Sequence, residues 1–219
     1  LDFKTEGNRP NGMYVGRFRN TDSSAPSRDF LRGYGMQGGA GGRGRWSGPG
    51  YGADWKQKVL TQLGPWGVGI NGWGEMLPSA ENHLALDGAV KDKWGIPVLR
   101  FHWKWSEHET RQAAHMQRTF ADWITAMGGK PRSQPLADGA KAIEPGGKII
   151  HEVGGAIMGS DPRKSVTNQW CQTWDVKNLF LTDGAPFCSN ADKNPTLTIM
   201  ALAWRASDYL LAGLKKGDL

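Results

Sequence analysis

Glycine is the sequence feature that most restricts the fold of this chain. It supplies 31 of the 219 residues, about twice the ordinary share of about 7%. Because glycine reaches backbone conformations closed to other residues and weakens helix and strand interiors, its abundance favours turns over long regular elements. Tryptophan is also frequent, at 11 residues, and its large flat side chain suits pockets. These two figures indicate an irregular domain shaped around a ligand.

Charge and hydropathy exclude several classes of protein. Lys and Arg number 27 against 21 Asp and Glu, a net charge of +6, and the basic residues are spread along the chain rather than grouped for nucleic-acid binding. No apolar run approaches the ~18 residues of a membrane span, and residues 1–11 carry charges where a signal peptide would be apolar. The length suits one large domain or two small ones.

Cysteine and histidine predict no metal site. Cys171 and Cys188 are too few for a disulfide scaffold and too far apart for a CxxC motif, although one bridge between them stays open. His83, His108 and His115 lack partners at ligand spacing. We therefore expect no bound metal.

Periodicity predicts an α+β fold. Ser106 and Glu109 form a capping box, and apolar residues then recur at helical spacing as far as Gly128. Residues 97–105 alternate as a strand, with Arg100 and His102 on a polar face and aromatic side chains on the other, as at the floor of a pocket. The remaining predicted elements are strands at residues 13–18, 148–151 and 178–182, a helix at residues 53–63, and a final helix that Asn194 caps, running from Pro195 to about residue 214.

The glycine-rich stretch at residues 33–52 contains one deceptive motif. Residues 39–44 match the G-x-G-x-x-G pattern of dinucleotide sites letter for letter. Such a site needs an apolar strand before the pattern and, after it, a helix whose N-terminus binds phosphate. Residues 45–50 contain two glycines and a proline and cannot form that helix. We interpret the run as a flexible or pocket-lining loop.

Three motifs follow one another in the C-terminal third. His151-Glu-Val-Gly-Gly leads into Met158-Gly, an apolar run ends in Asp183-Gly, and Asn194-Pro-Thr opens the last helix. In this order they resemble the C-terminal part of the glucose-methanol-choline (GMC) family of flavin oxidoreductases, in particular the branch with pyranose oxidase and gluconate dehydrogenase. The resemblance is strongest over residues 148–213, and Ala156 departs from the threonine of many members.

The resemblance implies a division into two parts. Residues 1–147 would form a substrate-binding domain, mainly an antiparallel sheet flanked by helices. Residues 148–219 would carry the catalytic groups and the strand and helix that complete the FAD-binding domain. The N-terminal FAD-binding half would lie outside this chain, in a separate chain or in the rest of a longer protein.

The resemblance also assigns roles to residues. His151 would take the hydroxyl proton while hydride leaves carbon for flavin N5, a task suited to a histidine side chain. Asn194 would orient the substrate oxygen. Without the resemblance, His151 reads as a hydrogen-bonded core residue and Asn194 as a helix cap. The residues expected to contact FAD are Asp183, Gly184, Pro195, Thr196 and Leu197.

Substrate contacts are predicted on the polar strand face and around the glycine-rich stretch. Aromatic faces stack on sugar rings while polar groups bind hydroxyls, and the alternative is ordinary core packing. The candidates are Arg100, His102, Ile149, Tyr34, Gln37 and Trp46.

Together these features predict the C-terminal catalytic half of an FAD-dependent sugar or polyol oxidoreductase, a dehydrogenase or an oxidase. Its expected partners are the FAD-binding half, a sugar or polyol, and a small subunit or an electron-accepting cytochrome, but no nucleic acid. The alternative is a carbohydrate-binding or scaffold module that keeps the fold without the chemistry. The sequence fixes no location, and the likeness to gluconate dehydrogenase favours the bacterial periplasm.

Overall fold

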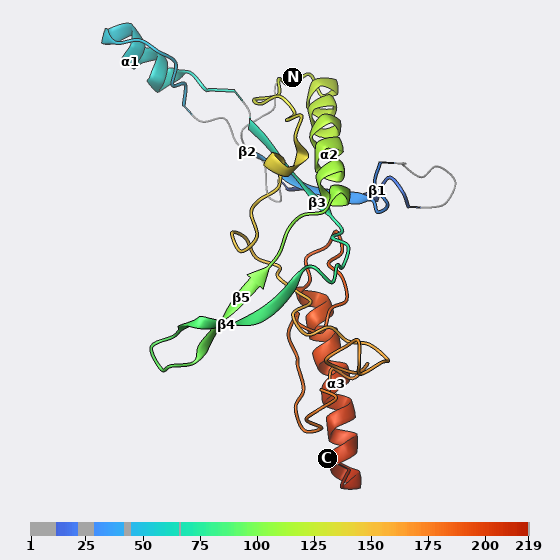
Figure 1. The fold of residues 1–219 in the computed structure, drawn as a ribbon. Helices are drawn as coiled ribbons and strands as arrows, with labels where there is room; N and C mark the ends of the chain where they lie inside the picture. Colours follow the sequence, from blue (N-terminus) through green and yellow to red (C-terminus); the bar gives the residue numbers. More distant parts are fainter. Residues whose placement is uncertain (1–11, 22–28, 42–44, 66, 219) are drawn as a thin grey trace.

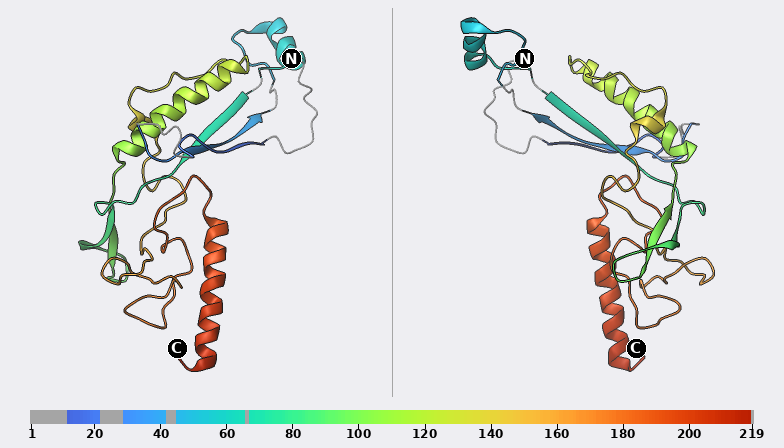
Figure 2. Two further views of the ribbon diagram at one scale, coloured as in Figure 1. Left: turned by 90° about the vertical axis from the view of Figure 1, so that its right-hand side faces the viewer. Right: turned by 60° about the vertical axis from the view of Figure 1, so that its left-hand side comes forward.

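The computed structural model describes residues 12–21, 29–41, 45–65 and 67–218. Three antiparallel strands form the main sheet in the order β1 (Gly12–Phe18), β2 (Tyr34–Gly41) and β3 (Gly67–Gly74). Helix α2 (Glu107–Ala126) covers one face of this sheet (Figure 1). Figure 2 shows the other face turned toward the C-terminal segment.

The hydrophobic core lies between α2 and the main sheet. Tyr34 and Met36 alternate along β2 toward the helix and pack with Phe30, Met116 and Phe120. The partly buried side chains that complete this core are Met13, Val15, Phe18, Ile70 and Trp123. Burial of these side chains holds α2 on the sheet.

Part of the glycine-rich stretch is a strand, and residues 39–41 of the G-x-G-x-x-G run belong to it, which corrects their interpretation as a loop. β2 occupies residues 34–41 and pairs with a strand on each side, so its backbone hydrogen bonds offset the poor strand propensity of glycine. The first residues of the G-x-G-x-x-G run end β2, and residues 42–44 lie outside the described residues. Glycine in β3 has a packing reason, since a Cβ at Gly72 would lie 2.5 Å from Sδ of Met116.

A second sheet is the hairpin of β4 (His83–Lys91) and β5 (Pro97–His102). β5 confirms the predicted strand over a shorter range, but Leu99 and Phe101 on its apolar face are 54% and 66% exposed. Helix α1 (Gly52–Thr61) confirms the helix predicted at residues 53–63; it projects from the body and buries none of its residues (Figure 1). The capping box of α2 is also confirmed, because the Ser106 side chain accepts from the backbone of the first turn and the Glu109 carboxylate accepts from the backbone N–H of Ser106 at 2.7 Å.

The C-terminal segment is mostly irregular. After the short 3-10 helix η1 (Gly139–Ala142), residues 143–195 contain no helix or strand, and isolated bridges such as Gln172 with Phe180 link them. The strands predicted at residues 148–151 and 178–182 are therefore wrong, because these short runs find no neighbouring strand along which a ladder extends. Helix α3 (Thr196–Lys216) confirms the predicted final helix and ends at Gly217, whose φ is 74°.

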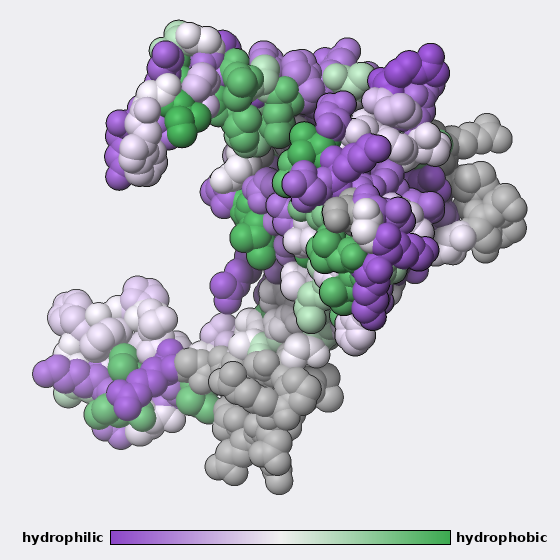
Figure 3. Space-filling view, turned by 90° about the horizontal axis from the view of Figure 1, so that it is seen from below, coloured by the Kyte–Doolittle hydropathy of each residue, from purple (hydrophilic) through white to green (hydrophobic). Residues whose placement is uncertain are grey.

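The surface carries large apolar side chains among polar ones. Leu86, Phe101 and Leu197 are exposed, and Figure 3 shows apolar patches on the face seen from below. Cys171 and Cys188 are both free thiols, so the bridge left open by the sequence does not form. Among the described residues, no helix combines the length and apolar character needed to cross a membrane.

Candidate active site

His151 is held from two directions. Its backbone has a φ of 87°, a left-handed conformation that few non-glycine residues adopt. The carbonyl oxygen accepts a hydrogen bond from Nδ2 of Asn190 at 3.0 Å. The imidazole packs against the indole ring of Trp73, with centroids 5.3 Å apart and ring planes at 48°. These contacts fix an otherwise unfavourable backbone and orient the ring.

The segment after His151 runs beside the Asp183–Gly184 turn. The backbone N–H of Gly154 donates to the carbonyl of Gly184 at 3.1 Å, and the hydrogen bonding continues to that of Met158 with Pro186 at 2.9 Å. Asp183 is exposed, and its Oδ1 accepts from the backbone N–H of Ala185, which closes the turn. The two motifs are therefore joined through their backbones.

Gly184 is the point where three segments meet. A Cβ at this position would lie 2.9 Å from Cγ1 of Val153 and 3.6 Å from Cδ1 of Ile199. Val153 follows His151 by two residues, and Ile199 lies in the first turn of α3. The structure thus brings together the His151 segment, the Asp183–Gly184 turn and the start of α3.

The start of α3 differs in detail from the sequence prediction. Pro195, not Asn194, is the N-cap residue, because its carbonyl accepts the hydrogen bond from Ile199. No side chain caps the helix, so the backbone N–H groups of its first turn keep their donor capacity. Asn194, Thr196 and Leu197 are exposed there. The Asn194 side chain forms no hydrogen bond with His151, although the contact of Asn190 with His151 ties their segments together.

A polar row crosses the face of the main sheet that α2 leaves open. Tyr14, Gln37 and Asn71 are paired across β1, β2 and β3, and paired residues share a face. They lie opposite to Met36, which faces α2. Gln37 was predicted from the sequence, whereas Tyr14 and Asn71 were missed. The alternation of Tyr34 and Met36 is the sequence signal for strand β2, whose pairing places Tyr14 and Asn71 beside Gln37. The many glycines around it obscure that signal.

Trp73 is a third residue that sequence reasoning missed. It pairs with Gly35 and therefore lies on the same open face as Gln37. Its indole Nε1 is buried and has no hydrogen-bond partner among the described residues. Trp73 therefore places an unpaired buried donor beside His151.

The other predicted substrate residues lie elsewhere. Tyr34 is fully buried in the core, with its hydroxyl 2.7 Å from Nδ1 of His115. Arg100 and His102 stand on the β4–β5 hairpin, where the His102 ring stacks on His83 at 4.5 Å. The residues that complete the predicted set are Ile149, which is exposed two residues before His151, and Trp46, which lies under Lys58 near α1. Of the predicted set, Gln37 shares a sheet face with Trp73, which contacts His151, and Ile149 precedes His151 by two residues.

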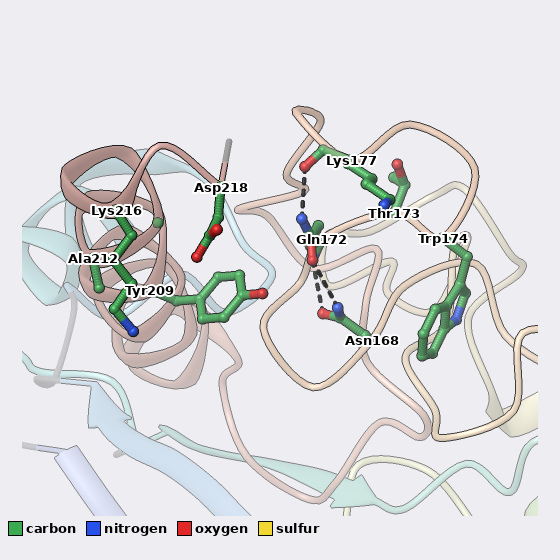
Figure 4. Close-up of a pocket in the computed structure, with 10 residues that line it drawn as sticks. Asn168, Gln172, Thr173, Trp174, Lys177, Tyr209, Ala212, Lys216 and Asp218 are labelled. Carbon is green, nitrogen blue, oxygen red and sulfur yellow. Dashed lines mark hydrogen bonds between the residues drawn. The ribbon is translucent and has the colours of Figure 1, made fainter.

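A separate pocket of about 390 Å³ lies farther along α3 (Figure 4). Tyr209 and Lys216 line one side, and the other side holds Gln172, whose Nε2 donates to the carbonyl of Lys177 at 2.6 Å. Tyr209 stands 13 positions beyond Thr196, or about 20 Å along the helix axis. This pocket is not part of the arrangement around His151. Within the described ranges, no group of three His, Cys, Asp or Glu could hold a metal ion.

Comparison with known proteins connects this arrangement to one family. A family model described as GMC oxidoreductase matches residues 78–203. The match includes the His151 segment, the Asp183–Gly184 turn and the first turns of α3.

Individual relatives extend the similarity toward the N-terminus. The chain is 34% identical to 2-methyl-1,2-propanediol dehydrogenase of Mycolicibacterium austroafricanum over 205 residues, which are 90% of this chain and 36% of that protein. It is 37% identical to the fructose dehydrogenase large subunit of Gluconobacter japonicus over 69% of this chain and 26% of that protein. For the gluconate 2-dehydrogenase flavoprotein of Pantoea cypripedii the identity is 31%, over 71% of this chain and 25% of that protein. The chain thus spans between a quarter and just over a third of these relatives.

Proposed function

The chain belongs to the GMC oxidoreductase family, and from that premise we propose that it supplies the proton-accepting and substrate-binding part of an FAD-dependent enzyme. The substrate would be a sugar or polyol, oxidised at a CH–OH group. The observation that carries the proposal is the meeting of three segments at Gly184, which gathers His151 and the start of α3 beside the open sheet face.

The residues at the start of α3 suit FAD. The uncapped first turn offers backbone N–H donors near Thr196 and Leu197, and a helix N-terminus carries partial positive charge that favours an anionic ring. Asp183 and Gly184 lie beside that turn and suit contacts with the ribityl part, whose hydroxyl groups can donate to the Asp183 carboxylate. When bound, FAD would supply the hydride acceptor at its N5 atom.

His151 and Asn194 would both contact the substrate hydroxyl group. The imidazole takes the hydroxyl proton, and its orientation against Trp73 supports this role because proton transfer requires a fixed donor–acceptor geometry. The exposed amide of Asn194 donates to the same oxygen as negative charge develops on it. Nε1 of Trp73 is a further donor on this side of the sheet.

The open sheet face would bind the remaining hydroxyl groups. Tyr14, Gln37 and Asn71 carry no charge, and both donate and accept hydrogen bonds, which suits a neutral polyol. Arg100, His102 and Trp46 stay predictions, and the proposal does not depend on them.

Helix α3 supports a larger assembly. Leu197, Met200 and Trp204 follow each other at helical spacing and are more than 60% exposed. The FAD-binding half of the enzyme would cover this stripe. One relative is named as a large subunit, and a small subunit or cytochrome partner here stays a prediction.

The test is His151→Ala in the full-length protein loaded with flavin. Anaerobic stopped-flow absorbance with a panel of sugars and polyols should show flavin reduction in the parent and a loss of about 10²–10⁴-fold in the variant, with flavin still bound. His83→Ala, on the exposed hairpin, should reduce flavin like the parent. Reduction by His151→Ala at the parent rate would show that His151 is not the base. A parent that no polyol reduces would instead favour the binding-module alternative.

A further inference from the structure

A buried carboxylate stands two residues before Asn194. Asp192 is 3% exposed, and its Oδ1 accepts hydrogen bonds from Nε and Nη2 of Arg17 at 2.9 and 2.6 Å. Lys193 donates to its other oxygen. Arg17 lies on β1, 175 positions away in sequence, and its Nη2 also bonds to Glu75 at 3.1 Å. The ion pair therefore joins the main sheet directly to the segment that leads into α3.

The same loop has two further anchors. The carbonyl of Asn190 accepts from the backbone N–H of Met76, and its side chain donates to the carbonyl of His151, both at 3.0 Å. Gly35 underlies Asp192 so closely that a Cβ there would lie 3.2 Å from Oδ2. Since residues 187–195 contain no helix or strand, the path of the loop depends on individual contacts such as these.

We propose that the Arg17–Asp192 ion pair is a positioning device that fixes Asn194 and the first turn of α3 relative to His151. The inference rests on the proposed function, because Asn194 matters only if it acts on the substrate oxygen. An apolar contact of the same size would hold the loop as firmly, but without direction. Two nitrogens of Arg17 converge on Oδ1 of Asp192 while Lys193 donates to Oδ2, so the three contacts together restrict the orientation of the carboxylate and the position of the loop.

Electrostatics keeps the ion pair charged in the folded protein. Burial opposes ionisation of Asp192, but hydrogen bonds from Lys193 and Arg17 outweigh it and hold the pKa of Asp192 below its usual value. Burial likewise opposes the charge on Arg17, and the contacts with Asp192 and Glu75 outweigh it and raise the pKa of Arg17. The ion pair therefore stays charged around neutral pH and does not act as a pH switch there.

The main variant is Asp192→Asn in the full-length, flavin-loaded protein, which keeps the side-chain size and removes the charge. Stopped-flow with the best polyol should show the flavin-reduction rate at saturation falling by at least ~10-fold, while the half-saturating concentration changes by less than ~3-fold. Arg17→Lys keeps the charge but loses one of the two hydrogen bonds to Asp192. Its flavin-reduction rate should lie between those of Asp192→Asn and the parent. Glu107→Gln, which breaks the exposed ion pair with Arg111, should match the parent.

A second variant displaces the loop without changing charge. Gly35→Ala introduces a Cβ 3.0 Å from the carbonyl oxygen of Val15 and 3.2 Å from Oδ2 of Asp192, and by pushing on the Asp192 carboxylate it should reproduce the fall in rate. Gly88→Ala, with nothing within 4 Å, should not. If Asp192→Asn does not fold, Gly35→Ala still tests whether the position of the loop controls the rate of flavin reduction.

Hydrogen exchange separates this proposal from the proposed function. Backbone amides at residues 190–198 should exchange faster in Asp192→Asn than in the parent, without any substrate. If no polyol reduces the parent, the proposed function fails and exchange still decides whether the ion pair fixes the loop. Unchanged exchange, or a reduction rate within ~2-fold of the parent, would overturn the proposal.

Discussion

Two regions of the molecule, the main sheet with α2 and the C-terminal segment, are each stabilised internally by different interactions. The main sheet and α2 share a core of large apolar side chains such as Tyr34, Met116 and Phe120. In residues 143–218, the most buried side chains are small or polar, among them Thr167, Cys171 and Pro186. The first region is stabilised by apolar burial, and the second by backbone hydrogen bonds and close turns. The candidate catalytic groups belong to the second region, where position depends on a few exact contacts.

The largest effect on stability is expected in the first region. Phe120→Ala should lower the free energy of unfolding by about 3–5 kcal/mol, because it removes a buried ring between Tyr34 and Trp123 and leaves a cavity. Urea denaturation followed by tryptophan fluorescence measures this change. Tyr51→Ala removes a ring that is 94% exposed at the N-cap of α1 and should change stability by less than about 0.5 kcal/mol. Equal effects would show that the core does not carry the stability of this region.

A smaller effect is expected where the second region is tightest. Gly184→Ala places a Cβ 2.9 Å from Cγ1 of Val153, a stiff β-branched side chain, and should cost about 1–3 kcal/mol. The same denaturation experiment measures it. Gly88→Ala adds the same methyl group in open space and should leave stability unchanged or raise it by up to about 1 kcal/mol. If both variants have the stability of the parent, the three segments are not closely packed at Gly184.

The difference between the two regions also decides what the sequence could predict. The Ser106 capping box and the apolar spacing after it predict helix α2, and the Asn-Pro sequence at residue 194 predicts helix α3. The strands β2 and β3 escape prediction because glycine has no side chain with which to show alternation. Their existence depends on pairing with distant strands, which local sequence does not express.

The site divides in the same way. His151, Asp183 and Asn194 are recognisable because each lies in a short contiguous motif. Tyr14 and Asn71 are not, since only the register of three strands places them in a row with Gln37. Trp73 was hidden for the same reason, and its neighbour His151 lies 78 positions away. Long-range register is therefore the information that the motifs lack.

The smallest effect concerns pH and belongs to the apolar region. Burial, together with the positive charges of Arg19 and Arg118, lowers the pKa of His115 below its ordinary value, and Asp29 opposes this only in part. The unfolded chain then binds a proton at higher pH than the folded chain does. Stability should therefore be complete above pH about 6.5 and decline as the pH falls below it.

His115→Gln tests this dependence by removing the titrating ring. Urea denaturation at a series of pH values from neutral to mildly acidic should give a flatter decline in the free energy of unfolding than the parent gives. Tyr34→Phe is the matched control, because it removes the hydroxyl 2.7 Å from Nδ1 of His115 but leaves the partly buried imidazole to titrate, so the slope should persist. If His115→Gln keeps the slope of the parent, the acid sensitivity comes from carboxylates such as Asp192, whose lowered pKa places their contribution at lower pH.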